Sequence, residues 1–174
     1  MTRRTVAIRR ARSEDVPALV ALGDRCFPDP WNAASFAEEL SGSAARIWLA
    51  QSDATVAGYL VARFVAGECH ILALAVAPEY RRGGIAKELV EVALADRSRG
   101  PVAVAHLEVR RGNRGAHAFY RSCGFEPVGM RSRYYPNGDD AVLLTRTGLL
   151  GAAGSDPAPS SRAARSGPAP WGRA

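Results

Sequence analysis

The residues best suited to hold a charged ligand lie in the segment LALAVAPEYRRGGIAKELV, residues 72–90. Its apolar first half predicts a buried strand, which passes through a turn containing Arg81, Arg82, Gly83 and Gly84 into a helix. The backbone N–H groups at the start of that helix lack intrahelical partners and lie at the positive end of its dipole. The glycines let the backbone approach a ligand without a clashing Cβ atom. The pattern predicts a pyrophosphate site, although an isolated turn of this kind is as often an ordinary strand-to-helix connection.

Two further side chains have the chemistry of acid–base catalysts. Glu108 lies near the end of VAVAHLEVR, a predicted buried strand, and Tyr120 lies in GAHAFYRSC, a predicted helix that Gly124 ends. The carboxylate can accept a proton and the phenol can donate one. Taken alone, each has a simpler interpretation: a strand-end glutamate that faces solvent, and a core tyrosine whose hydroxyl bonds to the backbone. Cys123, without an activating neighbour, is expected to be a packing residue.

Positioning these residues requires a sheet with helices packed on it. Alternating apolar patterns predict strands, and apolar residues at near-helical spacing predict helices. The first helix is expected to begin at Ser13, whose side chain can cap it, and to end before FPDPW. Strands are expected at 5–11, 45–51, 55–67, 68–78, 102–110, 125–135 and 140–147, and further helices at 32–40, 84–98 and 115–123. This order predicts one mixed α/β domain.

The length of 174 residues fits one domain over residues 1–149 and a tail over 150–174. The tail is dominated by Gly, Ala, Ser and Pro. Such a segment buries too little apolar surface to offset the entropy lost on ordering, so we expect it to be disordered.

Composition bears on several classes of function. The formal net charge of +6 comes almost entirely from scattered arginines, since Lys87 is the only lysine, and we expect no direct nucleic-acid binding. No apolar run approaches the ~20 residues that cross a bilayer, and the N-terminus lacks the apolar stretch of a secretory signal. We therefore expect a cytoplasmic protein with no membrane partner. Three widely spaced cysteines without a C-x-x-C pair favour reduced thiols and no metal site.

Several motifs, in order along the chain, give it a resemblance to a known family. Arg81-x-x-Gly84-x-Ala86 matches the acetyl-CoA signature of the GNAT acetyltransferase superfamily, at the start of the helix after the fourth strand. LEVRRGN and AFYRSCGF resemble the second half of the GNAT core. FPDPW, LEVR-x-x-N and RSRYYPNGDDAVLL resemble more narrowly the RimI-type ribosomal-protein alanine N-acetyltransferases and related N-terminal acetyltransferases. The resemblance covers residues 5–147.

The resemblance implies a GNAT fold, an α/β architecture with a mixed, mostly antiparallel twisted sheet and helices on both faces. The sheet would splay between its fourth and fifth strands to admit the cosubstrate acetyl-CoA. The strand backbone at Leu74, Ala75 and Val76 would pair with the pantetheine arm. The residues expected to hold the rest of the cosubstrate are Arg81, Arg82, Gly83, Gly84, Ile85 and Ala86 at the pyrophosphate, with Asn113 and Tyr120 beyond the fifth strand.

The resemblance also implies roles in catalysis and acceptor binding. Glu108 matches the family's general base and Tyr120 its general acid. Tyr134 and Tyr135 resemble a loop that grips the acceptor peptide, although they also suit cross-strand packing. Trp31 suits a core anchor and a wall of the acceptor pocket equally well.

The acceptor remains open between classes of amine. The amine must be neutral to attack a thioester, and a protein α-amino group has a pKa near 8, against about 10.4 for lysine. The N-terminus of a protein, with a ribosomal protein as the expected target, is therefore favoured. The alternatives are a lysine or small-molecule amine acetyltransferase on the same fold and, more remotely, a non-catalytic acyl-CoA sensor or RNA-binding module.

Overall fold

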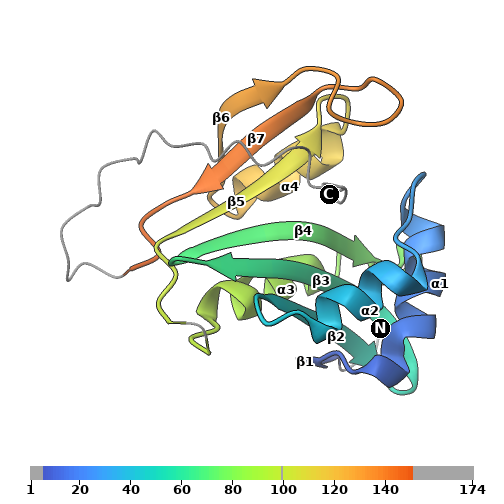
Figure 1. Ribbon diagram of the computed structural model, residues 1–174. Helices are drawn as coiled ribbons and strands as arrows, with labels where there is room; N and C mark the ends of the chain where they lie inside the picture. The colour runs from blue at the N-terminus through green and yellow to red at the C-terminus, as the bar shows by residue number, and fades with distance from the viewer. Residues whose placement is uncertain (1–5, 99, 151–174) are drawn as a thin grey trace.

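The computed structural model describes residues 6–98 and 100–150 and forms one sheet with helices packed on it (Figure 1). The strands are β1 (Ala7–Arg10), β2 (Ala45–Ser52), β3 (Thr55–Val65), β4 (Glu68–Val76), β5 (Val104–Arg110), β6 (Glu126–Arg131) and β7 (Ala141–Arg146). The helices are α1 (Val16–Cys26), α2 (Ala33–Ser41), α3 (Ile85–Ala95) and α4 (Arg114–Ser122), with short 3-10 helices η1 (Ser13–Asp15) and η2 (Pro78–Tyr80).

The seven strands lie in the order β1-β2-β3-β4-β5-β7-β6. Every neighbouring pair is antiparallel except β4 and β5, which are parallel and are joined by the crossover through α3. The predicted mixed, mostly antiparallel sheet is therefore confirmed. Within the described ranges, no helix is both long enough and apolar enough to cross a membrane. Beyond Leu150, the predicted tail lies outside the described residues.

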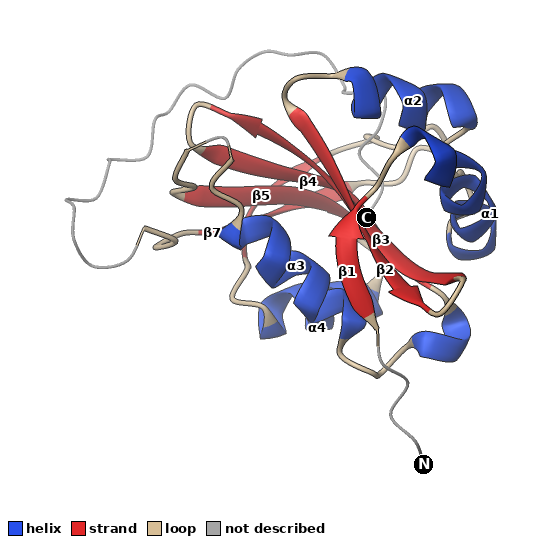
Figure 2. Cartoon of the chain, turned by 90° about the horizontal axis from the view of Figure 1, so that it is seen from below, coloured by secondary structure: helices blue, strands red, loops and turns tan. Residues whose placement is uncertain are grey.

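Helices cover the two faces of the sheet unequally (Figure 2). On one face α1 and α2 pack over β2, β3 and β4, with Leu19, Phe36 and Tyr59 in the core between them. On the other face α3 and α4 pack over the middle of the sheet, with Leu89 and Phe125 in a second core. No described residue of β5 belongs to the core under α1 and α2. One face of β5 is consequently left without a helix above it.

The burial of β5 shows this one-sided cover residue by residue. Leu107 and Val109 are buried against α3 and α4, whereas the intervening His106, Glu108 and Arg110 are only partly buried on the opposite face. The sequence analysis predicted a buried strand here. The structure corrects this to a half-covered strand, whose open face carries polar side chains.

The parallel pair β4–β5 separates soon after it begins. The two strands pair only from Glu68 to His70 against Val104 to His106. Beyond these residues they diverge, as Figure 1 shows. The register between β3 and β4 also shifts, since Val61 faces Ala73 whereas the next residue of β3 faces Ile71, which leaves Leu72 as an extra residue in β4. A bulge of this kind bends a strand, and it lies where β4 leaves β5.

Two predicted element ends are wrong. The strand expected over 125–135 ends at Arg131, so Tyr134 and Tyr135 lie in the β6–β7 loop and not in a cross-strand pair. In this loop Arg133 has φ +51°, and its N–H donates to Asp140 Oδ1 at 3.0 Å. The helix expected to reach residue 98 ends at Ala95.

The expected cap at Ser13 is also wrong. A 3-10 turn, η1, precedes α1, and the Asp15 carboxylate accepts the N–H of Arg12 at 2.7 Å. The same carboxylate accepts hydrogen bonds from Nη1 and Nη2 of Arg9, at 2.8 and 2.7 Å, and these bonds connect β1 to the start of α1. The hydrogen bond from Arg9 is the main cause that holds the pKa of Asp15 below its ordinary value.

We predict that Asp15→Asn lowers the free energy of unfolding at pH 7 by about 1 kcal/mol, since it removes a charge-assisted, partly exposed pair. The folded-state pKa of Asp15 is depressed, so its stabilisation is present above the unfolded pKa of about 3.9 and is lost as pH falls through the folded pKa. Urea unfolding between pH 7 and pH 3 should show the two proteins converging on acidification. Glu14→Gln, at a mostly exposed neighbour, is the control and should match the wild type throughout. A difference that persisted unchanged at pH 3 would contradict this assignment.

Candidate active site

The turn between β4 and α3 has the backbone geometry expected of an anion site. Gly84 is the N-cap of α3 and has φ +86°, and Arg82 is also left-handed, with φ +62°. These two residues, together with Arg81 and Gly83, are exposed. The first N–H groups of α3, at Ile85 and Ala86, point out of the helix toward this turn. The predicted pyrophosphate-holding segment therefore presents backbone donors at a helix N-terminus.

The Arg81 side chain turns back onto the protein. Its Nε donates to the carbonyl oxygen of Val76 at 3.0 Å, and its Nη2 lies 3.9 Å from Cys26 Sγ. Cys26 Sγ in turn lies 3.6 Å from the same carbonyl. The arginine of the signature thus fixes the end of β4 to the turn and to the end of α1. The positive φ of Arg82 had no signal in the sequence, because arginine does not favour that conformation.

The end of β4 offers an edge to an extended ligand. Leu74, Ala75 and Val76 pair with β3 on one side. The pairing there is close, since a Cβ atom at Gly58 would lie 2.8 Å from the Ala75 carbonyl oxygen. On the other side β5 has diverged, and no described strand pairs with these residues. A ligand arm that hydrogen-bonds as a strand does can take that place, and the turn at Gly84 lies just beyond it. These features fit acetyl-CoA.

Glu108 lies on the open face of β5 and contacts the last residue of β6. Its Oε1 is 3.8 Å from Arg131 Nη1, and its side chain is 22% exposed. The guanidinium of Arg131 also lies 5.6 Å from the centroid of the Tyr134 ring, so this arginine links Glu108 to the loop. Burial raises the pKa of Tyr134, with the charge of Glu108 as a smaller cause. The predicted base is therefore partly open to solvent and is linked through Arg131 to a residue predicted to bind the acceptor.

Tyr120 approaches from the opposite face of β5. It is 2% exposed, and its ring packs against Phe119 and Phe125 with centroids 5.0 and 5.7 Å away. Burial raises the pKa of its hydroxyl, with Cys123 and Tyr135 as smaller causes, so the phenol keeps its proton at neutral pH. This is the protonation state that a proton donor requires.

Asn113 holds the start of the helix that carries Tyr120. It is the N-cap of α4, where its Oδ1 accepts the N–H of Ala116 at 3.1 Å. It is exposed, just beyond the end of β5. Its predicted contact with CoA would use a residue whose position the cap already fixes.

The three residues predicted to bind the acceptor lie in different environments. Trp31 is 3% exposed and packs on Phe36 with centroids 5.4 Å apart, which favours the core anchor of its two interpretations. Tyr134 is half-buried and meets Tyr135 edge-on. The Tyr135 hydroxyl is buried without a hydrogen-bond partner among the described residues, and such an atom is suited to a bound ligand.

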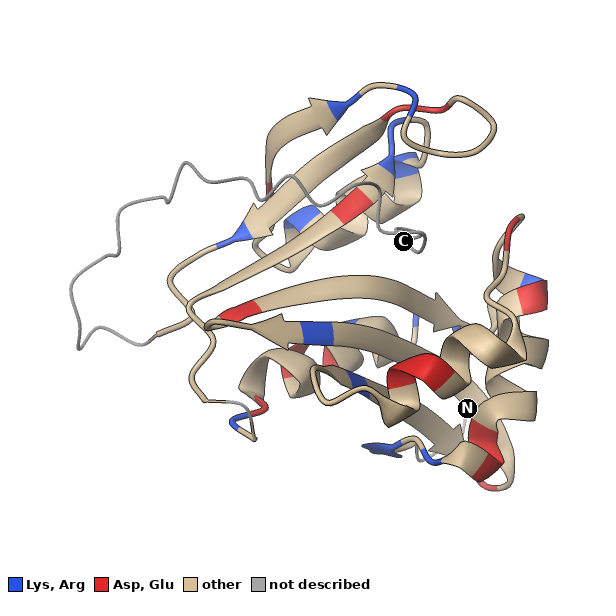
Figure 3. Ribbon diagram, viewed as in Figure 1, with Lys and Arg blue, Asp and Glu red and all other residues tan. Residues whose placement is uncertain are grey.

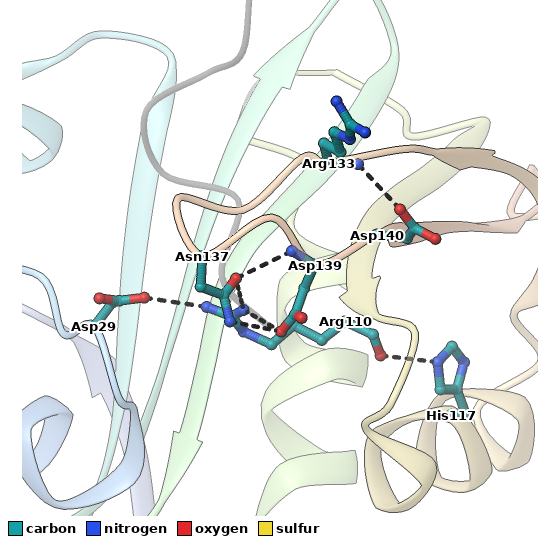
Figure 4. Close-up of polar contacts among 7 residues, drawn as sticks. All are labelled: Asp29, Arg110, His117, Arg133, Asn137, Asp139 and Asp140. Atoms are coloured by element: carbon teal, nitrogen blue, oxygen red, sulfur yellow. Dashed lines mark hydrogen bonds and ion pairs between the residues drawn. The ribbon is translucent and has the colours of Figure 1, made fainter.

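One residue of the site had no role in the sequence analysis. Arg110 ends β5, two residues after Glu108 on the same face, and it contacts Asp29, Asn137 and Asp139 (Figure 4). Asp29 is 81 positions away in the chain. No local sequence pattern can indicate a contact between two residues so far apart in the chain.

Two of the histidines make structural contacts at the closed end of the strand pair. His70 and His106 lie with ring centroids 5.2 Å apart, and His106 Nδ1 is 2.8 Å from Thr145 Oγ1. Burial and the neighbouring His70 lower the pKa of His106, despite an opposing effect of Glu68. Among residues 6–98 and 100–150, no cluster of His, Cys, Asp and Glu is arranged to hold a metal ion.

Known proteins share this architecture. The Acetyltransferase (GNAT) family model matches residues 16–125. The [ribosomal protein bS18]-alanine N-acetyltransferase of Escherichia coli is 30% identical over 140 residues, covering 79% of this chain and 94% of that protein. The crystal structure of the E. coli enzyme superposes with a TM-score of 0.77 at 28% identity, over 88% of this chain and 99% of that one.

Two further relatives extend the comparison. The N-alpha-acetyltransferase RimI of Mycobacterium tuberculosis is 36% identical over 140 residues, covering 78% of this chain and 84% of that protein. The structure of Arabidopsis thaliana NAA60 in complex with acetyl-CoA shares the fold, with a TM-score of 0.73 at 21% identity over 82% of this chain and 98% of that one. The predicted GNAT fold is therefore confirmed. The chain belongs to the GNAT acetyltransferase family and is an acetyl-CoA-dependent N-acetyltransferase.

Proposed function

We propose that this enzyme transfers the acetyl group of acetyl-CoA to the N-terminal α-amine of a protein, and that a ribosomal protein is its target. The E. coli relative, matched over nearly its whole length, is named for that activity on bS18. The observation that carries the proposal to this chain is the position of the β6–β7 loop. Arg131 lies between this loop and Glu108, since its Nη1 is 3.8 Å from Glu108 Oε1 and its guanidinium is 5.6 Å from the centroid of the Tyr134 ring. This supports an acceptor loop close to the proposed base.

Glu108 is the proposed general base. An N-terminal amine with a pKa near 8 is largely protonated at neutral pH and must lose its proton to attack. The carboxylate of Glu108 accepts that proton, directly or through a water molecule, while the amine nitrogen bonds to the thioester carbon. The backbone N–H near Val76 is the proposed donor to the oxygen that becomes negative.

Tyr120 is the proposed general acid. As the bond from carbon to sulfur breaks, the departing thiolate takes the phenolic proton. The nitrogen loses its second proton as the amide forms, and this proton restores the Tyr120 phenol. The products are an N-acetylated amine and free CoA, with the proton held by Glu108 released to water, and no acyl-enzyme forms. Glu108 and Tyr120 reach the diverging strands from opposite faces of β5, which suits a base on the side of the amine and an acid on the side of the sulfur.

The distribution of charge supports a protein acceptor over RNA. Figure 3 shows acidic and basic positions interspersed along the strands and helices. Arginines pair with acids across elements, as in Arg10–Asp96, Arg63–Glu39 and Arg146–Glu91. A nucleic-acid module would instead need a continuous basic face. We place the enzyme in the cytoplasm, where ribosomal proteins are made.

The first prediction concerns the acceptor. A panel would contain an alanine-starting ribosomal peptide, the same peptide with a blocked N-terminus and an internal lysine, and polyamines. We expect thiol release from acetyl-CoA only with the free N-terminus, and mass spectrometry should locate the acetyl group on the α-amine. Glu108→Gln should lower kcat/KM for that peptide about 100-fold or more, because the proton acceptor is lost.

Glu126→Gln, at an exposed glutamate of β6, serves as the matched control and should retain the wild-type rate. Reaction only with the lysine peptide or with polyamines would overturn the N-terminal assignment. It would favour the alternative acetyltransferase of lysine or small amines.

The second prediction concerns Tyr120. Tyr120→Phe should lower kcat about 100-fold and leave KM for acetyl-CoA nearly unchanged, because only the proton donor is removed. The wild-type rate should rise with pH as the acceptor amine, of pKa near 8, loses its proton. Ionisation of Tyr120 should not lower the rate at any pH up to about 10, because the pKa of that hydroxyl is raised above its ordinary value.

Tyr59→Phe is the control for a buried tyrosine. Its hydroxyl has no hydrogen-bond partner among the described residues, so the change should preserve both rate and stability. A Tyr120→Phe enzyme with the wild-type kcat would remove Tyr120 from the mechanism.

A further inference from the structure

The Arg110 side chain contacts two loops that meet at the end of β5. The α1–α2 loop, residues 27–32, and the β6–β7 loop, residues 132–140, come from opposite ends of the chain. Arg110 ends β5 and has a side chain only 18% exposed. We infer that Arg110 is a positioning residue that locks these two loops into one acceptor-binding rim. This inference rests on the proposed transfer to a protein N-terminus.

The contacts to the β6–β7 loop are dense (Figure 4). Arg110 Nη1 donates to Asn137 Oδ1 at 3.0 Å and to Asp139 Oδ2 at 2.9 Å. Asn137 Nδ2 also donates to Asp139 Oδ2, at 2.8 Å, which closes a small network. The guanidinium lies over the Tyr135 ring, 3.9 Å from its centroid. Arg110 therefore fixes both the tip of the loop and one of its two tyrosines.

The contact to the α1–α2 loop crosses between layers of the fold. Arg110 Nη2 donates to Asp29 Oδ2 at 3.1 Å. Two residues later, Trp31 anchors the same loop in the core beneath α1 and α2. One guanidinium thus joins a loop of the α1–α2 layer to a loop of the C-terminal strands.

The backbone of Arg110 makes the third connection. Its carbonyl oxygen accepts the N–H of Asn113 at 2.9 Å and lies 3.1 Å from His117 Nε2. Asn113 caps α4, the helix that carries Tyr120. The residue that orders the acceptor loops is therefore also fixed to the helix of the proposed acid.

The chemistry of these contacts requires arginine. The planar guanidinium offers donors in a rigid fork and can stack on an aromatic ring, whereas the ammonium group of lysine is a point charge. Without the fork, the two loops would move independently, and an acceptor would have to order them on binding. The turn proposed to hold acetyl-CoA, Arg82 to Ala86, lies on the other side of the divergence, at the start of α3.

The test is a steady-state analysis of Arg110→Gln and Arg110→Lys, with acceptor peptide and acetyl-CoA varied in turn. For Arg110→Gln, we expect KM for the peptide to rise about tenfold or more, with kcat within about threefold and KM for acetyl-CoA within about twofold. Arg110→Lys should recover only part of the loss. Arg146→Gln is the matched control, since it removes an ion-paired arginine of similar exposure. Arg110 pairs with the first residue of β7, whereas Arg146 is the last residue of that strand, so this change should leave all three constants unchanged.

A second variant isolates the link between the loops. Asp29→Asn should raise KM for the peptide several-fold in the wild type and have little further effect in Arg110→Gln, because the two side chains act as a pair. Asp29 is 40% exposed, so this variant folds even if the Arg110 variants do not.

Two results would overturn the inference. One is an unchanged KM for the peptide in Arg110→Gln and Asp29→Asn. The other is an equal loss in kcat and in both KM values together with a lower Tm, which describes a purely structural residue. The wild-type panel tests the proposed function separately. If the wild type accepts only another amine, the same comparison of KM with that amine decides the role of Arg110.

Discussion

β4 and β5 run side by side for three residue pairs and then part, and the rest of the site is arranged around that separation. Strand edges inside a protein carry N–H and C=O groups that need partners. Here the edge at Leu74 to Val76 lies next to the turn of Arg81 to Gly84 that begins α3. A fold that opens its sheet in the middle must also hold the strands firmly where they meet. His70, His106 and Thr145 do so at the closed end, with the extra residue Leu72 marking where β4 turns away.

The helices cover the sheet unequally on the two sides of this separation. α1 and α2 cover β2, β3 and β4 and stop short of β5, so β5 has one buried face and one open face. The open face carries Glu108 and Arg110, and the buried face packs on the helix of Tyr120. Groups with opposite requirements are thereby separated by a single strand. The proposed base, Glu108, keeps its contact with water, and the proposed acid, Tyr120, is kept away from water, which favours its protonated form.

Local patterns in the sequence were sufficient to predict the order and type of the elements, and the turn that is proposed to bind the pyrophosphate. The Gly-rich turn and its flanking strand and helix are contiguous, so their geometry follows from nearby residues. The half-covered face of β5 was missed because VAVAHLEVR reads as continuously apolar over much of its length, and which helices lie above a strand is a long-range property. The strand before Tyr134 and Tyr135 was predicted to be too long for a related reason. The strand ends where Arg133 adopts a left-handed backbone and bonds to Asp140, and neither event has a sequence signal.

The arrangement around Arg110 keeps the proposed acceptor contacts apart from most of those proposed for the cosubstrate. The proposed backbone donors to acetyl-CoA lie on β4 and at the start of α3, whereas both proposed acceptor loops are attached at the end of β5. The two loops can therefore exchange residues, during evolution or in the laboratory, without altering the acetyl-donor machinery, provided that an arginine and its two carboxylate partners stay in place. A scaffold of this kind is modular, with one half that is constant and another that can be adapted to new acceptors.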